Sequence, residues 1–237
     1  MMDAVVIATY NEAPTTGRLL HGLRDFRVFV VDDSSPDGTG EIASGFEHVT
    51  VISRPAKLGI ASAYLAGLGA ALETDAPYIV QMDAGGTHDP YYAGALAGLA
   101  ALTNADLVIG SRFMRRRRLG GDWLDGWTFH GGRTLLSLGA AFLMRRLGLD
   151  VRDATSGFRC WRASFLRGLD FGAVRAEGFA FQLELLYQAR RAGAEIVELP
   201  VPYRLTNSTF NAGMVREALS IYGGLWRDHV LRRSETV

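Results

Sequence analysis

The stretch YIVQMDAGGTHDP, residues 78–90, passes from an apolar segment rich in β-branched residues into a polar loop with glycines. Such a run, ending at Asp83, predicts a buried strand followed by a functional loop. The next positions that would point the same way as Asp83 along an extended chain hold Gly85 and Thr87. The stretch therefore raises the question of whether Asp83 binds a metal ion, and with which partners.

Four further segments repeat this apolar pattern. They are DAVVIATY (3–10), RVFVVDD (27–33), HVTVISR (48–54) and ADLVIGSR (105–112). Near-continuous apolar runs of this length are typical of strands buried on both faces of a parallel sheet. Helical patterns lie between them, at residues 14–25, 37–45, 57–73 and 90–101. Because strand and helix alternate, residues 1–112 are predicted to form a doubly wound, Rossmann-like α/β sheet flanked by helices.

Polar side chains follow the predicted strand ends. They are Asn11 and Glu12, Asp32 and Asp33, Asp83, and Ser111 and Arg112. In an open parallel sheet these ends share one edge, and ligands bind along it. Capping of the following helix is the alternative role, and it suits Asp37 and Thr39 better than Asp33 or Asp83. We therefore expect a binding site at this edge.

The pattern changes beyond residue 112. Residues 115–130 are basic and then rich in Gly and Trp, which predicts a long functional loop. Residues 133–148 are apolar between arginines, which fits either a core helix or a helix on a membrane surface. Next come a predicted turn and helix (153–166), an amphipathic helix (178–193), an edge strand (194–204) and a final helix (212–233). No linker separates these segments, so residues 1–237 are predicted to form one domain.

Composition narrows the functional classes. The 237 residues carry a formal net charge of zero, so no nucleic-acid partner is expected. The single cysteine, Cys160, excludes an internal disulfide and a cysteine-based zinc site, and it fits a reducing cytoplasmic setting. The longest uncharged runs have 15 residues, fewer than the ~18–20 needed to span a bilayer. Without a signal-peptide pattern, we expect a soluble protein or one at the membrane surface.

Two local patterns bear on the kind of ligand. RFMRRRR, residues 112–118, places five arginines in seven positions, which fits either a solvated basic loop or a contact with anionic lipid headgroups. No G-x-G-x-x-G follows the first strand, where ATYNEAP stands instead. A pyrophosphate grip of the dinucleotide type is therefore disfavoured, and with it a nicotinamide-dependent oxidoreductase.

Several segments together resemble a known family. They are TYNEAP, VVDDSSPDGTG, RPAKLGIASAYLAGL, QMDAGGTHDP, VIGSRF, DATSGFRCWR and GFAFQLELL. In this order they resemble the family-two glycosyltransferases of the GT-A fold, and among these the dolichyl-phosphate (polyprenyl-phosphate) mannosyltransferases. The resemblance spans residues 5–205. It implies an inverting transfer of a hexose, most simply mannose from GDP-mannose, to a polyprenyl or dolichyl phosphate.

The resemblance also implies where the donor binds. It assigns nucleotide binding to Ala8, Tyr10, Glu12, Asp33 and Lys57. It places the D-x-D-type motif at Asp83, Ala84 and Gly85, with Asp83 taking part in catalysis. Residues 1–112 would then form the nucleotide-sugar half, and residues 113–237 the acceptor half with its C-terminal helices.

The metal site departs from the family pattern. Gly85 stands where the family usually has a second aspartate, whereas Asp83, Thr87 and His88 match. Asp83 and Thr87 are the expected ligands, with oxygens of the donor diphosphate and water completing the shell of a Mg²⁺ or Mn²⁺ ion. We therefore expect the metal to be held weakly and to arrive with the donor. Asp89 reads better as the cap of the helix that begins at Pro90.

The acceptor side depends on arginines. An acceptor phosphate is already an anion near neutral pH, so no general base is required, but cations must hold two anions together. The resemblance assigns this catalytic role to Arg112 and Arg133, whose planar guanidinium groups suit phosphate. Ser156 either positions the acceptor phosphate or belongs to a structural turn. Such an enzyme would work at the inner face of the membrane, as a peripheral protein.

Two alternatives stay open. The family often carries a lysine after the edge strand, whereas YRLTNSTFN, residues 203–211, has Ser208 without one, and Arg204 is the nearest cation. This difference and Gly85 leave room for a UDP-sugar donor with another acceptor. The incomplete metal motif also leaves room for a non-catalytic protein that binds a nucleotide sugar or a lipid phosphate.

Overall fold

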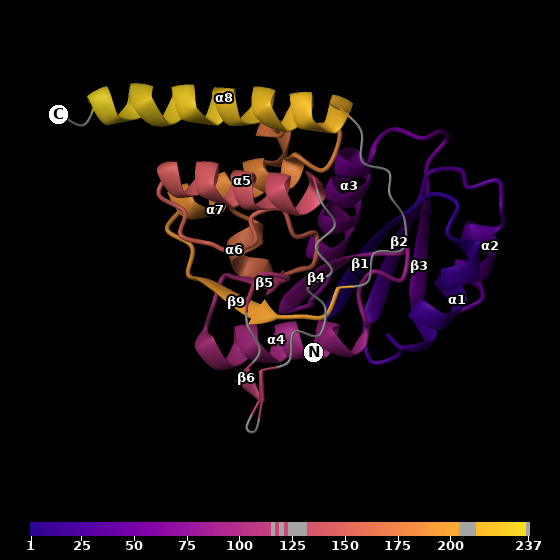
Figure 1. The fold of residues 1–237 in the computed structure, drawn as a ribbon. Helices are drawn as coiled ribbons and strands as arrows, with labels where there is room; N and C mark the ends of the chain where they lie inside the picture. The colour runs from indigo at the N-terminus through magenta and orange to yellow at the C-terminus, as the bar shows by residue number, and fades with distance from the viewer. Residues whose placement is uncertain (115–116, 119–120, 123–131, 204–211, 236–237) are drawn as a thin grey trace.

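A seven-stranded sheet runs through the centre of the protein (Figure 1). The computed structural model describes residues 1–114, 117–118, 121–122, 132–203 and 212–235, with the backbone alone for residues 117–118, 121–122, 132–136, 212 and 232–235. The sheet consists of β1 (Ala4–Thr9), β2 (Arg27–Asp32), β3 (Val49–Ser53), β4 (Tyr78–Asp83), β5 (Leu107–Ser111), β8 (Arg159–Arg162) and β9 (Ile196–Pro200). Their spatial order is β3-β2-β1-β4-β8-β5-β9.

All strands of this sheet run parallel except β8, which lies antiparallel between β4 and β5. The parallel strands therefore end at one common edge of the sheet. A separate short pair, β6 (Arg117–Arg118) and β7 (Gly121–Asp122), is antiparallel. Of the predicted loop at 115–130, only these two strands fall within the described residues.

Helices cover both faces of the sheet. One face carries α1 (Ala13–His21), α2 (Thr39–Ser44) and α4 (Tyr91–Thr103). The other carries α3 (Ile60–Leu72), α5 (Gly132–Arg146), α6 (Ala163–Leu166), the 3₁₀ turn η1 (Phe171–Ala173), α7 (Phe181–Arg191) and α8 (Ala212–Glu235). The long helix α8 passes over α5 and α7 as an outer layer, and its C-terminal end projects beyond them (Figure 1).

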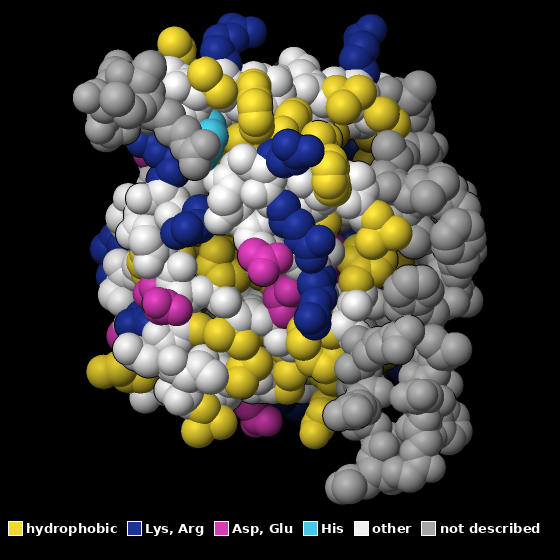
Figure 2. Space-filling model, turned by 60° about the vertical axis from the view of Figure 1, so that its left-hand side comes forward, with side chains coloured by type: hydrophobic (Ala, Val, Ile, Leu, Met, Phe, Trp, Pro, Cys, Tyr) yellow, Lys and Arg dark blue, Asp and Glu magenta, His cyan; other side chains and the backbone are white. Residues whose placement is uncertain are grey.

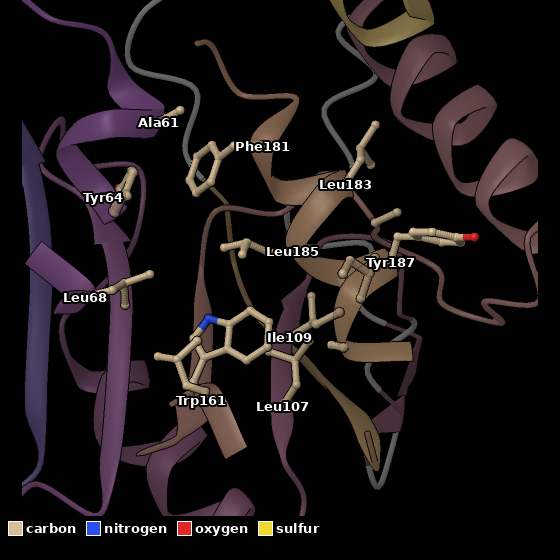
Figure 3. Packing of buried hydrophobic residues seen from close by; sticks show 14 of the residues in the cluster. Ala61, Tyr64, Leu68, Leu107, Ile109, Trp161, Phe181, Leu183, Leu185 and Tyr187 are labelled. Carbon is tan, nitrogen blue, oxygen red and sulfur yellow. The ribbon is translucent and has the colours of Figure 1, made fainter. Parts of the chain in front are cut away.

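Two cores follow from the alternation of side chains along the central strand. In β1, Ala4 and Val6 point into the core beneath α3 and α7, whereas Val5 and Ile7 point into the core beneath α1 and α4. Figure 3 shows the first core, where residues of α3 face residues of α7 above Trp161 of β8. The ring of Tyr64 stacks on that of Phe181, with centroids 5.6 Å apart. This stacking joins the two halves of the chain.

The predicted strands and helices of residues 1–112 are confirmed, and β9 is the predicted edge strand. The prediction for residues 153–166 was wrong in part, because β8 stands between the turn and the helix. Cys160 and Trp161 alternate between the two cores, and Arg159 is buried as well. An arginine at each end of a four-residue strand hides this alternation in the sequence. Arg159 is accommodated because it donates to the carbonyl oxygens of Ala154, Ser156 and Gln182.

Helix α3 approaches the sheet closely because of one glycine. A Cβ atom at Gly67 would lie 2.4 Å from Val6 Cγ1 and 2.9 Å from Val31 Cγ2. Gly69 of the same helix has no heavy atom within 4 Å of the corresponding position. Both residues lie inside a helix, so a comparison of the two separates the packing requirement from helix propensity.

We expect Gly67→Ala to lower the free energy of unfolding by about 1–3 kcal/mol, because the added methyl group overpacks the interface between α3 and the sheet. Gly69→Ala is the matched control and should raise the same free energy by about 0.5–1 kcal/mol through helix propensity. Denaturant unfolding of the two variants measures both effects. Equal changes in the two variants would contradict the close packing at Gly67.

Candidate functional site

A large polar cavity opens at the common edge of the parallel strands. It has a volume of about 1200 Å³. The residues predicted for the donor and the metal all line it: Ala8, Tyr10, Glu12, Asp33, Lys57, Asp83, Ala84 and Thr87. The edge gathers them because β1, β2 and β4 run parallel and adjacent.

Asp33 is held in place at the floor of this cavity. It is buried, and its carboxylate pairs with the guanidinium group of Arg54 and accepts a hydrogen bond from the backbone N–H of Leu58 at 3.2 Å. Arg54 also donates to the carbonyl oxygen of Gly59. These contacts neutralise Asp33 and tie the segment before α3 to the end of β2. Sequence analysis did not identify Arg54.

A cation and an aromatic ring meet on another wall of the cavity. The Nζ of Lys57 lies 3.9 Å from the centroid of the Tyr10 ring, within the range of a cation–π contact. Glu12, which follows Tyr10 closely in sequence, lines the same cavity, and partial burial is the main cause of the raised pKa of its carboxyl group. Asp83 and Asp37 raise that pKa further by like-charge repulsion, against a hydrogen bond from Thr15 that lowers it. The cavity thus carries carboxylates as well as a lysine.

Asp83 sits at the end of β4 with both oxygens in defined surroundings. Its Oδ1 accepts a hydrogen bond from the Tyr64 hydroxyl at 2.9 Å, and its Oδ2 lies 3.5 Å from Nε2 of His88. Burial raises the pKa of Tyr64 well above its ordinary value, so this hydroxyl stays protonated and remains a donor. Burial is also the main cause of the lowered pKa of His88, whose ring packs against Phe158 at 4.6 Å. The Asp83 side chain remains 28% exposed.

The surroundings of Asp83 fit a divalent cation that takes most of its ligands from the substrate and from water. Asp83 offers a partly exposed carboxylate and Thr87 a hydroxyl, whereas Gly85 offers no side chain. Within the described part of the chain, no three His, Cys, Asp or Glu residues converge closely enough to hold a metal ion by themselves. Oxygen donors of this kind suit Mg²⁺ or Mn²⁺, with substrate and water oxygens completing the shell.

A second, more apolar cavity of about 370 Å³ lies between α5, α7 and α8. Its apolar lining includes Ala140, Leu143, Met144, Leu183, Val215, Ala218, Leu219 and Tyr222. Its polar end includes Asp83, His88, Arg112, Thr155 and Ser156. The two cavities share Asp83, Phe179, Tyr203, Met214 and Glu217, so they meet at Asp83.

Arg112 is fixed by a buried carboxylate at the polar end of the second cavity. Its Nε donates to Asp153 Oδ2 at 2.7 Å and its Nη2 to Asp153 Oδ1 at 2.6 Å. Burial alone would lower the pKa of Arg112, but the facing Asp153 outweighs burial and raises it. The hydroxyl of Thr155 accepts a further bond from Nη2. Arg112 is thus a permanent cation whose orientation is set by Asp153.

The other predicted acceptor residues are placed less completely. The Ser156 hydroxyl donates to the carbonyl oxygen of Gly110 at 2.7 Å and accepts from the backbone N–H of Phe158, so it serves the turn before β8. Arg133 lies in the first turn of α5, and its side chain is outside the described residues. The same holds for the side chains of residues 115–118 and for Arg204 and Ser208.

Sequence analysis missed one wall of the polar cavity. Residues 175–179 line it, together with Arg216 and Glu217 of α8. Arg175 and Arg216 add cations to the one predicted at Lys57. The motif GFAFQLELL begins at Gly178 and is the one sequence signal close to this wall. Nothing in the hydrophobic pattern of α8 indicates that Arg216 lines the same cavity as Tyr10 and Glu12, near the other end of the chain.

Comparison with known proteins agrees with this architecture. Residues 4–169 match the family described as Glycosyl transferase family 2. An undecaprenyl-phosphate mannosyltransferase of Micrococcus luteus is 37% identical over 231 residues, covering 92% of this chain and 91% of the relative. A polyprenol monophosphomannose synthase of Mycolicibacterium smegmatis is 35% identical over 228 residues, covering 91% and 83%.

A solved structure shares the fold. Glucosyl-3-phosphoglycerate synthase of Mycobacterium tuberculosis, in complex with Mn²⁺, UDP and glucosyl-3-phosphoglycerate, superposes with a TM-score of 0.68 at 20% identity, covering 96% of this chain and 79% of that one. The mostly parallel seven-stranded sheet of this chain, with helices on both faces, is the predicted GT-A fold. From the family match and the two relatives together, the chain belongs to glycosyl transferase family 2.

Proposed function

We propose that this glycosyltransferase transfers mannose from GDP-mannose to a polyprenyl phosphate, with inversion at the anomeric carbon. One observation carries the proposal. A polar cavity large enough for a nucleotide sugar and an apolar cavity adjoin each other, and the carboxylate of Asp83 lines both. A polar donor and a lipid acceptor are the substrates that such a pair of cavities suits. The names of the two relatives support mannose and a polyprenyl phosphate.

The polar cavity supports the donor half of the proposal. Tyr10, Glu12, Asp33 and Lys57 would bind the nucleotide, along with the backbone at Ala8 and Ala84. A Mg²⁺ or Mn²⁺ ion held by Asp83 and Thr87 would neutralise the diphosphate as it leaves. Because Asp83 already accepts a hydrogen bond from Tyr64, its carboxylate is oriented before the substrate arrives.

The apolar cavity supports the acceptor half. Its polar end, which includes Ser156, would bind the phosphate through Arg112, and its apolar lining would bind the first prenyl units. Arg133, at the start of α5, is proposed as a second cation for the phosphate on the family resemblance alone. A phosphate oxygen of the acceptor attacks the anomeric carbon, and the bond from that carbon to the diphosphate oxygen breaks. The nucleoside diphosphate leaves with the electron pair, so no side chain has to remove a proton.

The outer surface of α5 and α8 supports contact with a membrane. Large apolar side chains are exposed there: Leu138 and Phe142 on α5, and Leu219, Trp226, Val230 and Leu231 on α8. Arg145, Arg146 and Arg227 lie on the same two helices. Figure 2 shows hydrophobic and basic side chains interspersed along the upper part of the molecule, where α8 lies. This mixture fits the interface of an anionic bilayer at the cytoplasmic face.

Among the helices that the structure describes, none combines the length and the apolar character needed to cross a bilayer. We therefore propose peripheral contact through α5 and α8, adjacent to the cavity that would take the lipid acceptor.

Asp83→Asn should lower turnover by ~10²- to 10³-fold, because the neutral amide stabilises neither the metal nor the developing charge. Asp89→Asn is the matched control. Asp89 is exposed and accepts from the backbone N–H of Tyr91, a capping role that asparagine also fills, so turnover should be retained. The measurement is release of nucleoside diphosphate from GDP-mannose and UDP-sugars with Mn²⁺ and a polyprenyl phosphate. Full turnover by Asp83→Asn would exclude the metal assignment.

Replacing Phe142 and Trp226 by serine should weaken binding to anionic vesicles about tenfold, since both side chains would lose their burial among acyl chains. The control replaces Tyr91 and Leu102, which are exposed on α4 at the opposite side of the sheet. Sedimentation with vesicles containing anionic phospholipid reports the partition coefficient. An equal loss in both double variants would argue against α5 and α8 as the docking surface.

A further inference from the structure

One short segment forms a wall of both cavities. Residues 175–179 lie between η1 and α7 and line the polar cavity, and Phe179 also lines the apolar cavity. The segment is anchored at its start, where the buried carboxylate of Glu184 accepts hydrogen bonds from the backbone N–H groups of Arg175 and Ala176 at 3.0 and 2.8 Å. Further backbone contacts join it to two other helices, α8 and α3.

Glu217 joins the segment to α8. Its Oε1 accepts hydrogen bonds from the backbone N–H groups of Glu177 at 2.9 Å and Gly178 at 2.8 Å. Hydrogen bonds to an ionised carboxylate are stronger than bonds between neutral groups. Glu217 itself lines both cavities. Glu217 therefore links the position of α8 to the position of residues 177–178.

The opposite side of the segment contacts the donor-binding half. The carbonyl oxygen of Glu177 accepts a hydrogen bond from the backbone N–H of Ala61, in the first turn of α3, at 3.1 Å. Just before α3, the N–H of Leu58 binds the carboxylate of Asp33. A continuous series of contacts therefore runs from α8 through Glu217 and residues 177–178 to the start of α3 and Asp33.

Gly178 is required by the close approach of Glu217. A Cβ atom at position 178 would lie 2.4 Å from Glu217 Oε2. The φ angle of Gly178 is outside the left-handed region, so its backbone accepts an L-residue without strain. The obstacle to a side chain at 178 is thus Glu217 itself, which makes the two residues a pair that can be tested from either side.

We propose that Glu217 is a positioning residue that couples the docking position of α8 to the shape of the donor cavity. Because α8 lines the apolar cavity, occupancy of the apolar cavity is coupled to the donor cavity in the same way. This inference rests on the proposed function, because it takes the apolar cavity as the acceptor site. A lipid phosphate that packs between α5 and α8 fixes α8, and Glu217 transmits this order to the wall of the donor cavity. Donor and acceptor then raise each other's affinity by the same factor.

Binding of a nucleoside diphosphate without its sugar measures the coupling in the absence of turnover. The dissociation constants of GDP and UDP are determined by calorimetry with Mn²⁺, with and without a short-chain polyprenyl phosphate. We expect the lipid to tighten nucleotide binding to the wild-type chain about fivefold or more. Glu217→Ala should reduce this effect to less than about twofold, and Glu217→Gln, whose amide oxygen also accepts both N–H groups, should restore most of it.

Asp228→Ala is the matched control on the same helix, because it also removes a carboxylate that ties α8 to its neighbour. The carboxylate of Asp228 ties α8 to α7 by accepting from the Tyr187 hydroxyl and Arg191, away from both cavities. This variant should keep the coupling of the wild-type chain. If it loses the coupling as Glu217→Ala does, general docking of α8 explains the effect and the role of Glu217 is excluded.

A double-mutant cycle tests the contact with Gly178. Gly178→Ala should weaken nucleotide binding in the wild-type background, whereas in the Glu217→Ala background the same change should add less than about twofold. Additive effects would overturn the inference. So would coupling that persists in Glu217→Ala with a wild-type unfolding temperature. A wild-type chain that binds neither nucleotide would overturn the proposed function, and the inference with it.

Discussion

The hydrogen bond from the Tyr64 hydroxyl to Asp83 is the contact on which the site depends. It links α3 to the end of β4, and the stacking of Tyr64 on Phe181 extends the link to α7. This buried hydroxyl stays protonated because its pKa is raised, so it orients the Asp83 carboxylate before substrate binds. Because the polar and apolar cavities meet at this carboxylate, a small displacement of Asp83 would separate the two reactants. The core packing around Tyr64 is thus part of the chemistry.

The sequence was most informative where function and strand ends coincide. Glu12, Asp33 and Asp83 each follow or end a parallel strand, and a parallel sheet brings such positions to one edge whatever their separation in the chain. The prediction of Tyr10, Lys57 and Thr87 as neighbours came from the family resemblance and agrees with the lining of the polar cavity. For the strand-end residues Glu12, Asp33 and Asp83, the fold class alone determines most of the spatial relationship.

Other features depend on contacts that leave no periodic signal. Arg54 and Asp153 are ordinary charged residues in sequence, yet one neutralises Asp33 and the other orients Arg112. The antiparallel strand β8 was missed because its two apolar residues lie between arginines. One of these, Arg159, is buried and donates hydrogen bonds to carbonyl oxygens. The contribution of α8 to the donor cavity depends on where a C-terminal helix docks, which hydrophobic patterning does not specify. Side-chain partnerships of this kind follow from tertiary packing.

The reversed direction of β8 changes which loop serves the reaction. In β1, β2, β4 and β5 the loop after the strand reaches the functional edge, but in β8 the register of Arg159 opposite Gln81 and Arg162 opposite Tyr78 places the amino end there. Residues 155–157, in the loop that precedes β8, therefore line the apolar cavity, and the residues that follow β8 emerge at the opposite end of the strand. Substitutions in the loop before β8 therefore change the lining of the apolar cavity, whereas insertions in residues 163–170, directly after β8, would lie away from both cavities.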